Sequence, residues 1–162
     1  MASERFDIGA WSAAIPTDPT EPCELTTGGY DHTAGAQDPL LLINIARDEP
    51  TARLRVNVIA VTELTQPELL GARAALSVDG PAARTLALIP AAIVETEVER
   101  RVTFRPLPTG AEQAGLRDLV DAMRRAAQAK VDINGLPLEP AFSMQGLEAI
   151  WQRASPACGL RP

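Results

Sequence analysis

Four residues of one turn-rich stretch carry side chains suited to chemistry: Tyr30, Asp31, His32 and Asp38. His32 is the only histidine of the chain, so a Ser–His–Asp or Cys–His arrangement would need it as the general base. With the two aspartates it could also serve a small hydrolase through acid–base chemistry. A histidine surrounded by glycine, aspartate and threonine is more often solvent-exposed than catalytic. We therefore assign no catalytic residue, expect a protein that is not an enzyme, and interpret these four residues as a binding surface.

The two cysteines, Cys23 and Cys158, lie near opposite ends of the chain. They can be two buried free thiols, one of them can be reactive, or they can pair. Neither has a basic neighbour in sequence to lower its pKa, which argues against a reactive thiol. A bridge over so long a span would remove unfolded-state entropy worth roughly 4–5 kcal/mol. Pairing is favoured because it would fasten a proline-rich segment to a helix end, and it predicts an oxidising compartment such as the bacterial periplasm.

Spacing motifs for metals and cofactors are missing from the sequence. There is no C-x-x-C, no H-E-x-x-H, no G-x-G-x-x-G and no P-loop. We therefore expect neither a metal site nor a cofactor.

The charge balance argues against nucleic acids and anionic lipids as partners. The formal net charge is −6 and the basic residues are not clustered, whereas both ligands require concentrated Lys and Arg. No run reaches the roughly 18 apolar residues needed for a membrane span. The opening residues, MASERFDIG, lack the regions of a signal peptide, so an exported form would carry its leader ahead of this sequence.

Strand-like patterns dominate the chain. Residues 5–15 read as one strand, with Phe6, Ile8 and Trp11 as inward positions. Residues 17–39 are rich in proline and glycine and are expected to be irregular.

Two hairpins are expected in the middle of the chain. Residues 40–47 and 52–61 form the first, because the second of these segments alternates strictly between apolar and polar residues. Residues 72–80, which end in Asp-Gly, and 82–90 form the second. Residues 92–106 are expected to be one bent strand, or two strands around a bulge near Arg100.

Two helices are expected. Thr109 and Glu112 form a T-x-x-E capping box, and apolar residues recur at helical spacing up to Ala127, which predicts an amphipathic helix of about five turns. A short helix over 147–154 closes the chain. The pattern predicts one α+β domain over residues 1–162, mainly antiparallel and sandwich-like, with one long amphipathic helix and a short C-terminal helix.

The order of these features resembles a known family. Trp11 and Cys23, the strand pair LLLINIA and LRVNVIAV, the segment ALSVDG and the closing FSMQGLEAIW are similar to small exported proteobacterial proteins of the invasion-associated locus B type and related periplasmic families. The resemblance implies a β-rich sandwich in the periplasm or at the cell surface. It supplies no catalytic residues.

These observations lead to one main expectation and two alternatives. The main expectation is a small exported protein of the bacterial envelope, bridged by Cys23 and Cys158, that binds another protein. The first alternative is a cytoplasmic structural or assembly subunit with free thiols. The second is a small hydrolase built around His32.

Overall fold

The computed structural model describes residues 4–31, 36–48, 53–95, 100–107 and 112–160, and for 29–31, 36–38 and Glu112 it describes the backbone alone. The elements are β1 (Glu4–Ile8), β2 (Trp11–Ile15), β3 (Cys23–Asp31), β4 (Ala36–Ala46), β5 (Arg53–Thr62), α1 (Gln66–Leu70), β6 (Ala74–Val78), β7 (Arg84–Glu95), β8 (Arg100–Pro106), α2 (Glu112–Arg124), β9 (Gln128–Ile133), β10 (Leu136–Pro137), β11 (Phe142–Ser143), α3 (Leu147–Ala154) and a 3₁₀ turn over Pro156–Cys158.

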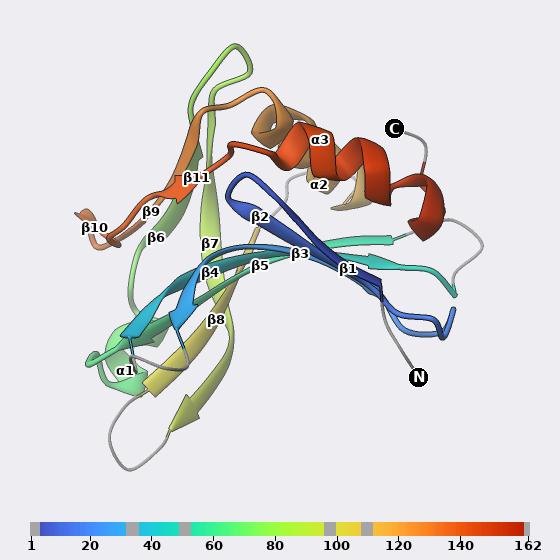
Figure 1. Ribbon diagram of the computed structural model, residues 1–162. Coiled ribbons are helices and arrows are strands. Elements are labelled where there is room, and N and C mark those ends of the chain that lie inside the picture. Colours follow the sequence, from blue (N-terminus) through green and yellow to red (C-terminus); the bar gives the residue numbers. More distant parts are fainter. Residues whose placement is uncertain (1–3, 32–35, 49–52, 96–99, 108–111, 161–162) are drawn as a thin grey trace.

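The described strands form one sheet in the order β1-β2-β3-β4-β5-β8-β7-β6-β9-β10, with β11 paired to β9. All of these pairings are antiparallel. The sheet curves into a half-barrel, and α2 and α3 lie over one face (Figure 1).

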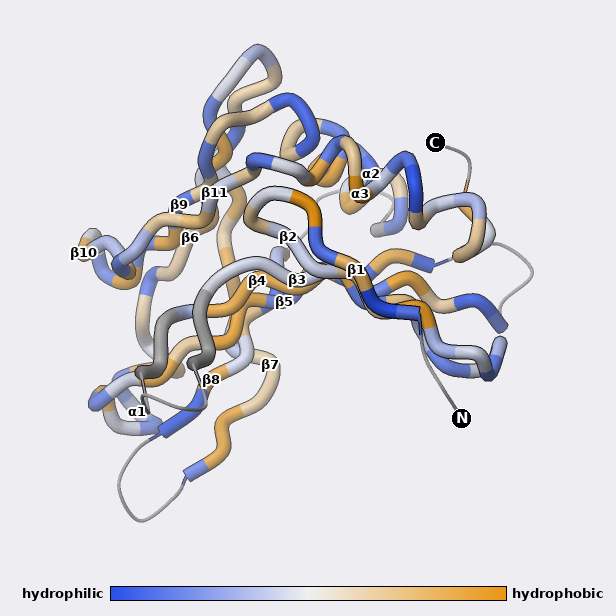
Figure 2. The backbone as a smooth tube through the Cα atoms, viewed as in Figure 1, coloured by the Kyte–Doolittle hydropathy of each residue, from blue (hydrophilic) through white to orange (hydrophobic). Residues whose placement is uncertain are grey.

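The mainly antiparallel β prediction is confirmed, and a sandwich of two facing sheets is not. Inward side chains of the sheet and apolar residues of α2 and α3 form one buried cluster. Figure 2 shows hydrophobic residues gathered along the middle of β4 and β5. Among the described helices, none combines the length and apolar composition that a bilayer crossing needs.

The first strand prediction was wrong. Residues 5–15 are not one strand but the hairpin of β1 and β2, in which Ile8 lies opposite Trp11. Gly9, with φ +59°, allows the tight reversal between them. Trp11 is buried as expected, whereas Phe6 and Ile8 are half-buried.

The prediction that residues 17–39 are irregular was also wrong. Among the described residues of this segment, a loop precedes Cys23, where β3 begins and pairs with both β2 and β4. Leu25 and Thr27 alternate inward with Cys23 and are buried, so this stretch has the period of a half-buried strand despite its glycines.

The two central hairpins are confirmed. β4 pairs with β5, and Leu54, Val56 and Val58 are buried as the alternation predicts. β6 pairs with β7. Residues 92–106, however, belong to two antiparallel strands, since β7 continues to Glu95 and β8 begins at Arg100.

The long amphipathic helix is shorter than expected. α2 ends at Arg124, although the apolar spacing continues to Ala127. The Asp79 carboxylate accepts the backbone N–H groups of Ala127 and Gln128 at 2.9 and 3.0 Å. These bonds draw the chain into β9 instead of another helical turn. The closing helix α3 is confirmed, with Leu147, Ile150 and Trp151 buried.

Candidate functional site

The predicted disulfide is present between Cys23 and Cys158. Their Cα atoms lie 6.1 Å apart, and both residues are 0% exposed. The bond joins the first residue of β3 to the turn that follows α3. Because neither sulfur meets solvent, we interpret this disulfide as structural.

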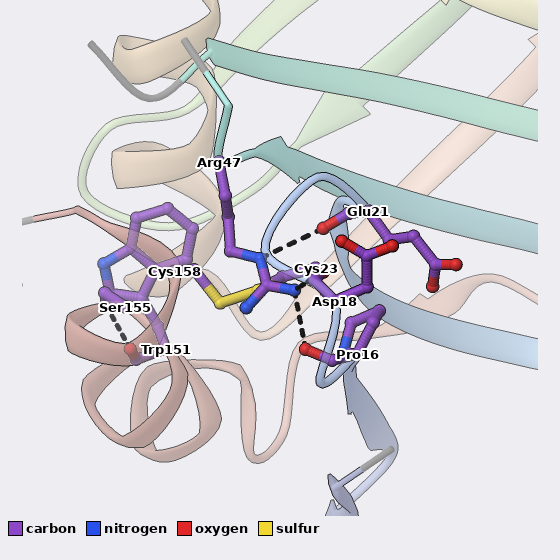
Figure 3. The surroundings of a disulfide bond; sticks show 8 residues. All are labelled: Pro16, Asp18, Glu21, Cys23, Arg47, Trp151, Ser155 and Cys158. Carbon is purple, nitrogen blue, oxygen red and sulfur yellow. Dashed lines mark hydrogen bonds between the residues drawn. A yellow bond between two sulfur atoms is a disulfide. The ribbon is translucent and has the colours of Figure 1, made fainter. Parts of the chain in front are cut away.

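Arg47 holds the loop that leads into Cys23 (Figure 3). Its guanidinium donates to the backbone carbonyls of Glu21, Pro16 and Asp18 at 3.0, 2.6 and 2.7 Å. Within the same loop, hydrogen bonds from the backbone and side chain of Thr20 lower the pKa of Asp18. The proline-rich segment therefore enters β3 in a fixed path.

Trp151 packs on the other side of the disulfide and is covered by arginine. Arg117 and Arg124 lie over its ring, with guanidinium carbons 5.9 and 5.3 Å from the ring centroid. Arg124 also donates to both carboxylate oxygens of Glu148 at 2.6 and 2.9 Å. This hydrogen bonding lowers the pKa of Glu148 and raises the pKa of Arg124. The network ties α2 to α3.

The turn of the β1–β2 hairpin rests on the start of α3. The Ala10 N–H donates to the Gln145 carbonyl at 2.9 Å, and the Trp11 indole N–H donates to the Ser143 carbonyl at 3.0 Å. A Cβ added at Gly146 would collide with the Ile8 carbonyl oxygen. We call this contact of the β1–β2 turn with residues 143–146 the hairpin seat. It joins the two ends of the described chain, as the disulfide also does.

The predicted binding residues fall at the far end of the β3–β4 hairpin. Tyr30 lies opposite Gln37 and Asp31 lies opposite Ala36 in the backbone pairing. Asp38 belongs to β4 near the same end, and His32 lies outside the described residues. The fold therefore brings Tyr30, Asp31 and Asp38 to one end of one hairpin.

A second site was missed by the sequence analysis. We call it the arginine cleft: a depression of about 470 Å³ lined by Arg53, Arg55, Arg105, Pro106 and Gln113, among others. Its lining residues come from β5, from the last residues of β8, from Ala91 of β7 and from the first described turns of α2. Val56 and Leu116, both buried, lie at its apolar base.

The cleft exists because the pairing of β5 with β8 stops early. The ladder runs from Thr62–Arg100 to Val58–Phe104. Continuing this register would place Pro106 opposite Val56, and proline has no N–H to donate. Beyond that point β5 is covered by a side chain instead: the Gln113 amide accepts from the Leu54 N–H at 2.8 Å and donates to the Leu54 carbonyl at 3.0 Å.

One signal for the cleft was visible in the sequence. Arg53 and Arg55 are polar members of the strict alternation over residues 52–61, and they alternate with the buried Leu54 and Val56. Arg105-Pro106 follows a strand pattern as well, and a proline there marks the end of a ladder. What the sequence did not show is that these two places are neighbours.

Among the described residues, no group of three or more His, Cys, Asp or Glu side chains is arranged to hold a metal ion. Comparison of the chain with protein-family models, curated proteins and solved structures returned no match.

Proposed function

We propose that this protein is a small exported, disulfide-bridged protein of the bacterial envelope that binds another protein and is not an enzyme. The observation that carries the proposal is the buried Cys23–Cys158 bond. Disulfides persist in oxidising compartments and are rare in the cytosol. The alternative of a cytoplasmic assembly subunit required free thiols, and the bond does not favour it.

The proposed binding surface is the end of the β3–β4 hairpin, with Tyr30, Asp31, His32 and Asp38. Support comes from the register of the hairpin, which pairs Tyr30 with Gln37 and Asp31 with Ala36 and so gathers the described residues of the surface at one end. Tyrosine is also among the residues that most often dominate a protein interface.

The location is tested by thiol alkylation of protein exported through its native leader, followed by intact mass measurement under denaturing conditions. We expect two alkyl groups to add after reduction and none before it. Alkylation of both cysteines without reductant would contradict the envelope proposal and return the cytoplasmic subunit to first place.

The binding surface is tested by capture of partners from periplasmic extract. The Tyr30→Ala/His32→Ala variant should retain less partner than the unmodified protein. Asp118→Ala, an exposed change on α2, serves as the control and should retain it fully. Equal retention by all three proteins would remove the hairpin end from consideration.

The hydrolase alternative is examined with the single variant His32→Ala. If the exported protein hydrolyses a panel of ester and peptide substrates and His32→Ala abolishes that activity, the non-enzymatic proposal fails.

A further inference from the structure

The second half of β7 forms a free edge of the sheet. β7 pairs with β6 only over Arg84 to Leu88, whereas it pairs with β8 as far as Glu95. Among the described residues, no strand lies on the other side of residues 89–95. In Figure 1 this part of β7 extends below β6, alongside β8. We call residues 89–95 the β7 edge.

The backbone of Ile93 faces outward from the β7 edge. The Leu107 N–H donates to the Ala87 carbonyl at 2.8 Å, so from Leu107 backward every second residue of β8 turns its backbone groups toward β7. By this alternation the β8 partners of Ala92 and Val94 also turn toward β7. Ile93, which lies between these two, therefore turns its N–H and its carbonyl away from β8. No hydrogen bond to either group is formed by the described residues.

The side chains of the β7 edge are apolar, although free edges are commonly protected by charge. Residues 89–94 read Ile-Pro-Ala-Ala-Ile-Val; both alanines are exposed, and Val94 is 56% exposed. Figure 2 shows the last part of β7 as a hydrophobic stretch. The carboxylate that follows, Glu95, is paired with Arg100 at 2.7 Å. Two copies of this chain, each of net charge −6, can therefore meet at this edge without opposing like charges.

We propose that the β7 edge pairs antiparallel with the same edge of a second copy of this chain, so that the two sheets become one. The two-fold axis passes beside Ile93, and the Ile93 N–H of each copy donates to the Ile93 carbonyl of the other. Val94 of each copy then lies opposite Ala92 of the other, which matches apolar side chains across the new pair of strands. Such a symmetric contact requires a surface that is complementary to itself.

The edge itself selects this register. Outward backbone groups must meet outward groups, so the two strands can slide only in steps of two residues. Sliding toward the start of β7 brings in Pro90, which has no N–H, and then Leu88, which already pairs with β6. Sliding the other way sets Glu95 opposite Ile93 and then opposite Glu95 of the second copy, where like charges repel.

A second copy fits this edge better than a foreign segment does. No charged side chain on residues 89–94 can select a foreign sequence, whereas self-pairing matches the edge in length, charge and polarity at once. β7 pairs with neither β3 nor β4, so this proposal and the proposal for the β3–β4 hairpin end can fail independently.

The first test is sedimentation of the oxidised full chain from micromolar to millimolar concentration. We expect the mass to rise from one chain to two, with weak association because a single pair of short strands buries little area. A mass of one chain at every concentration would overturn the proposal.

Hydrogen exchange then identifies the surface. Exchange of the Ile93 amide should slow as the protein is concentrated, because this N–H gains a partner only in the dimer. The Val94 amide, which faces β8 within one chain, is the internal control and should exchange slowly at all concentrations. Dimerisation without a change at Ile93 would contradict the proposal. If the chain alone stays single and only periplasmic extract slows exchange at Ile93, the edge binds a strand of another protein and the second-copy proposal is wrong.

The register is tested by isotope-filtered NMR of a mixture of labelled and unlabelled chains. We expect a contact between the Hα atoms of Ala92 in one copy and Val94 in the other, since these residues form a close, non-hydrogen-bonded pair. A contact of Val94 with Val94 instead would contradict the register centred on Ile93.

A pair of variants locates the contact. Val94→Glu should weaken dimerisation at least tenfold, because each copy then places a carboxylate opposite Ala92 of the other. The single chain tolerates this change, since Val94 is exposed and lies opposite Arg101. Leu136→Glu on β10 is the matched control: it adds the same charge at a residue that is 73% exposed and should leave the dissociation constant unchanged. Equal weakening in both variants would show general charge repulsion and would count against the β7 edge.

Discussion

At the scale of single residues, the contact between Gly9 and Gly146 decides how the two ends of the fold meet. Each glycine has a positive φ, +59° and +92°, and each would meet the backbone of the opposite segment if it carried a Cβ. The close approach allows the Ala10 N–H to reach the Gln145 carbonyl. Both the backbone conformation and the contact therefore require glycine here.

Gly146→Ala should lower the free energy of unfolding by about 3 kcal/mol, because backbone strain and collision with Ile8 add together. Gly135→Ala is the matched control: its φ is +80°, but a Cβ there meets nothing within 4 Å. Strain alone should cost this control about 1 kcal/mol. Urea denaturation of both variants checks the difference, and equal losses would contradict the proposed contact.

Glu148 should make stability depend on pH in a defined direction. Hydrogen bonding from Arg124 lowers its pKa, so the ionised carboxylate stabilises the folded state above the usual glutamate value of 4.5. That stabilisation is lost as the pH falls through the lowered folded value.

Glu148→Gln should therefore reduce stability at neutral pH by less than about 1 kcal/mol, since the carboxylate is half exposed. The difference from the unmodified protein should shrink toward zero in acid. Thermal unfolding across pH measures it, with Asp118→Asn on the same helix layer as control. A constant difference at every pH would argue against the role of the Glu148 charge.

At the scale of elements, one side chain takes the place of a strand. The Gln113 amide forms with Leu54 the pair of bonds that a neighbouring strand would form. α2 is thereby fixed to the edge of β5 as well as to the core, through Leu116 and Leu119. The sheet can open at Pro106 without leaving Leu54 unbonded.

Gln113→Met should keep the shape of this side chain and lose both bonds. We expect a loss of about 1–2 kcal/mol in the free energy of unfolding and faster hydrogen exchange of the Leu54 amide. Gln145→Met, at an exposed residue whose side chain forms no hydrogen bond with the described residues, should show neither effect. Unchanged exchange at Leu54 would mean that Gln113 does not cover the strand edge.

Sequence patterns correctly predicted the elements whose structure is determined by their own residues. The alternation in β5 and the apolar spacing of α3 were sufficient, because each buries one face along its whole length. The pairing of Cys23 with Cys158 was also predicted. β3 was missed because its threonines and glycines resemble a loop, although Leu25 and Thr27 are inward. The end of α2 depends on Asp79, which is distant in sequence.

The candidate sites divide in the same way. Tyr30, Asp31 and Asp38 are near one another in sequence, so their common location followed from the chain itself. The arginine cleft depends on Arg55 and Arg105 meeting where β5 and β8 separate. That meeting is set by the register of two strands, which no local pattern contains.

At the scale of the whole molecule, the disulfide joins residues 135 positions apart. Replacing both cysteines by alanine should lower the free energy of unfolding by roughly 4–5 kcal/mol, mainly by freeing the unfolded chain. Urea denaturation checks this. Reductant should destabilise the unmodified protein and leave the double variant unchanged. If oxidised protein and double variant unfold at the same urea concentration, the bond contributes no stability.

The hairpin seat has a consequence for biosynthesis. The turn at Gly9 packs against Gln145 and Gly146, and Cys23 is bonded to Cys158. The first strands of the chain are therefore held by contacts with residues that are synthesised much later. At about 5–20 residues per second, translation leaves the Cys23 thiol unpaired for on the order of ten seconds. Closure of the Cys23–Cys158 bond therefore waits for the residues of α3 and of the turn that follows it.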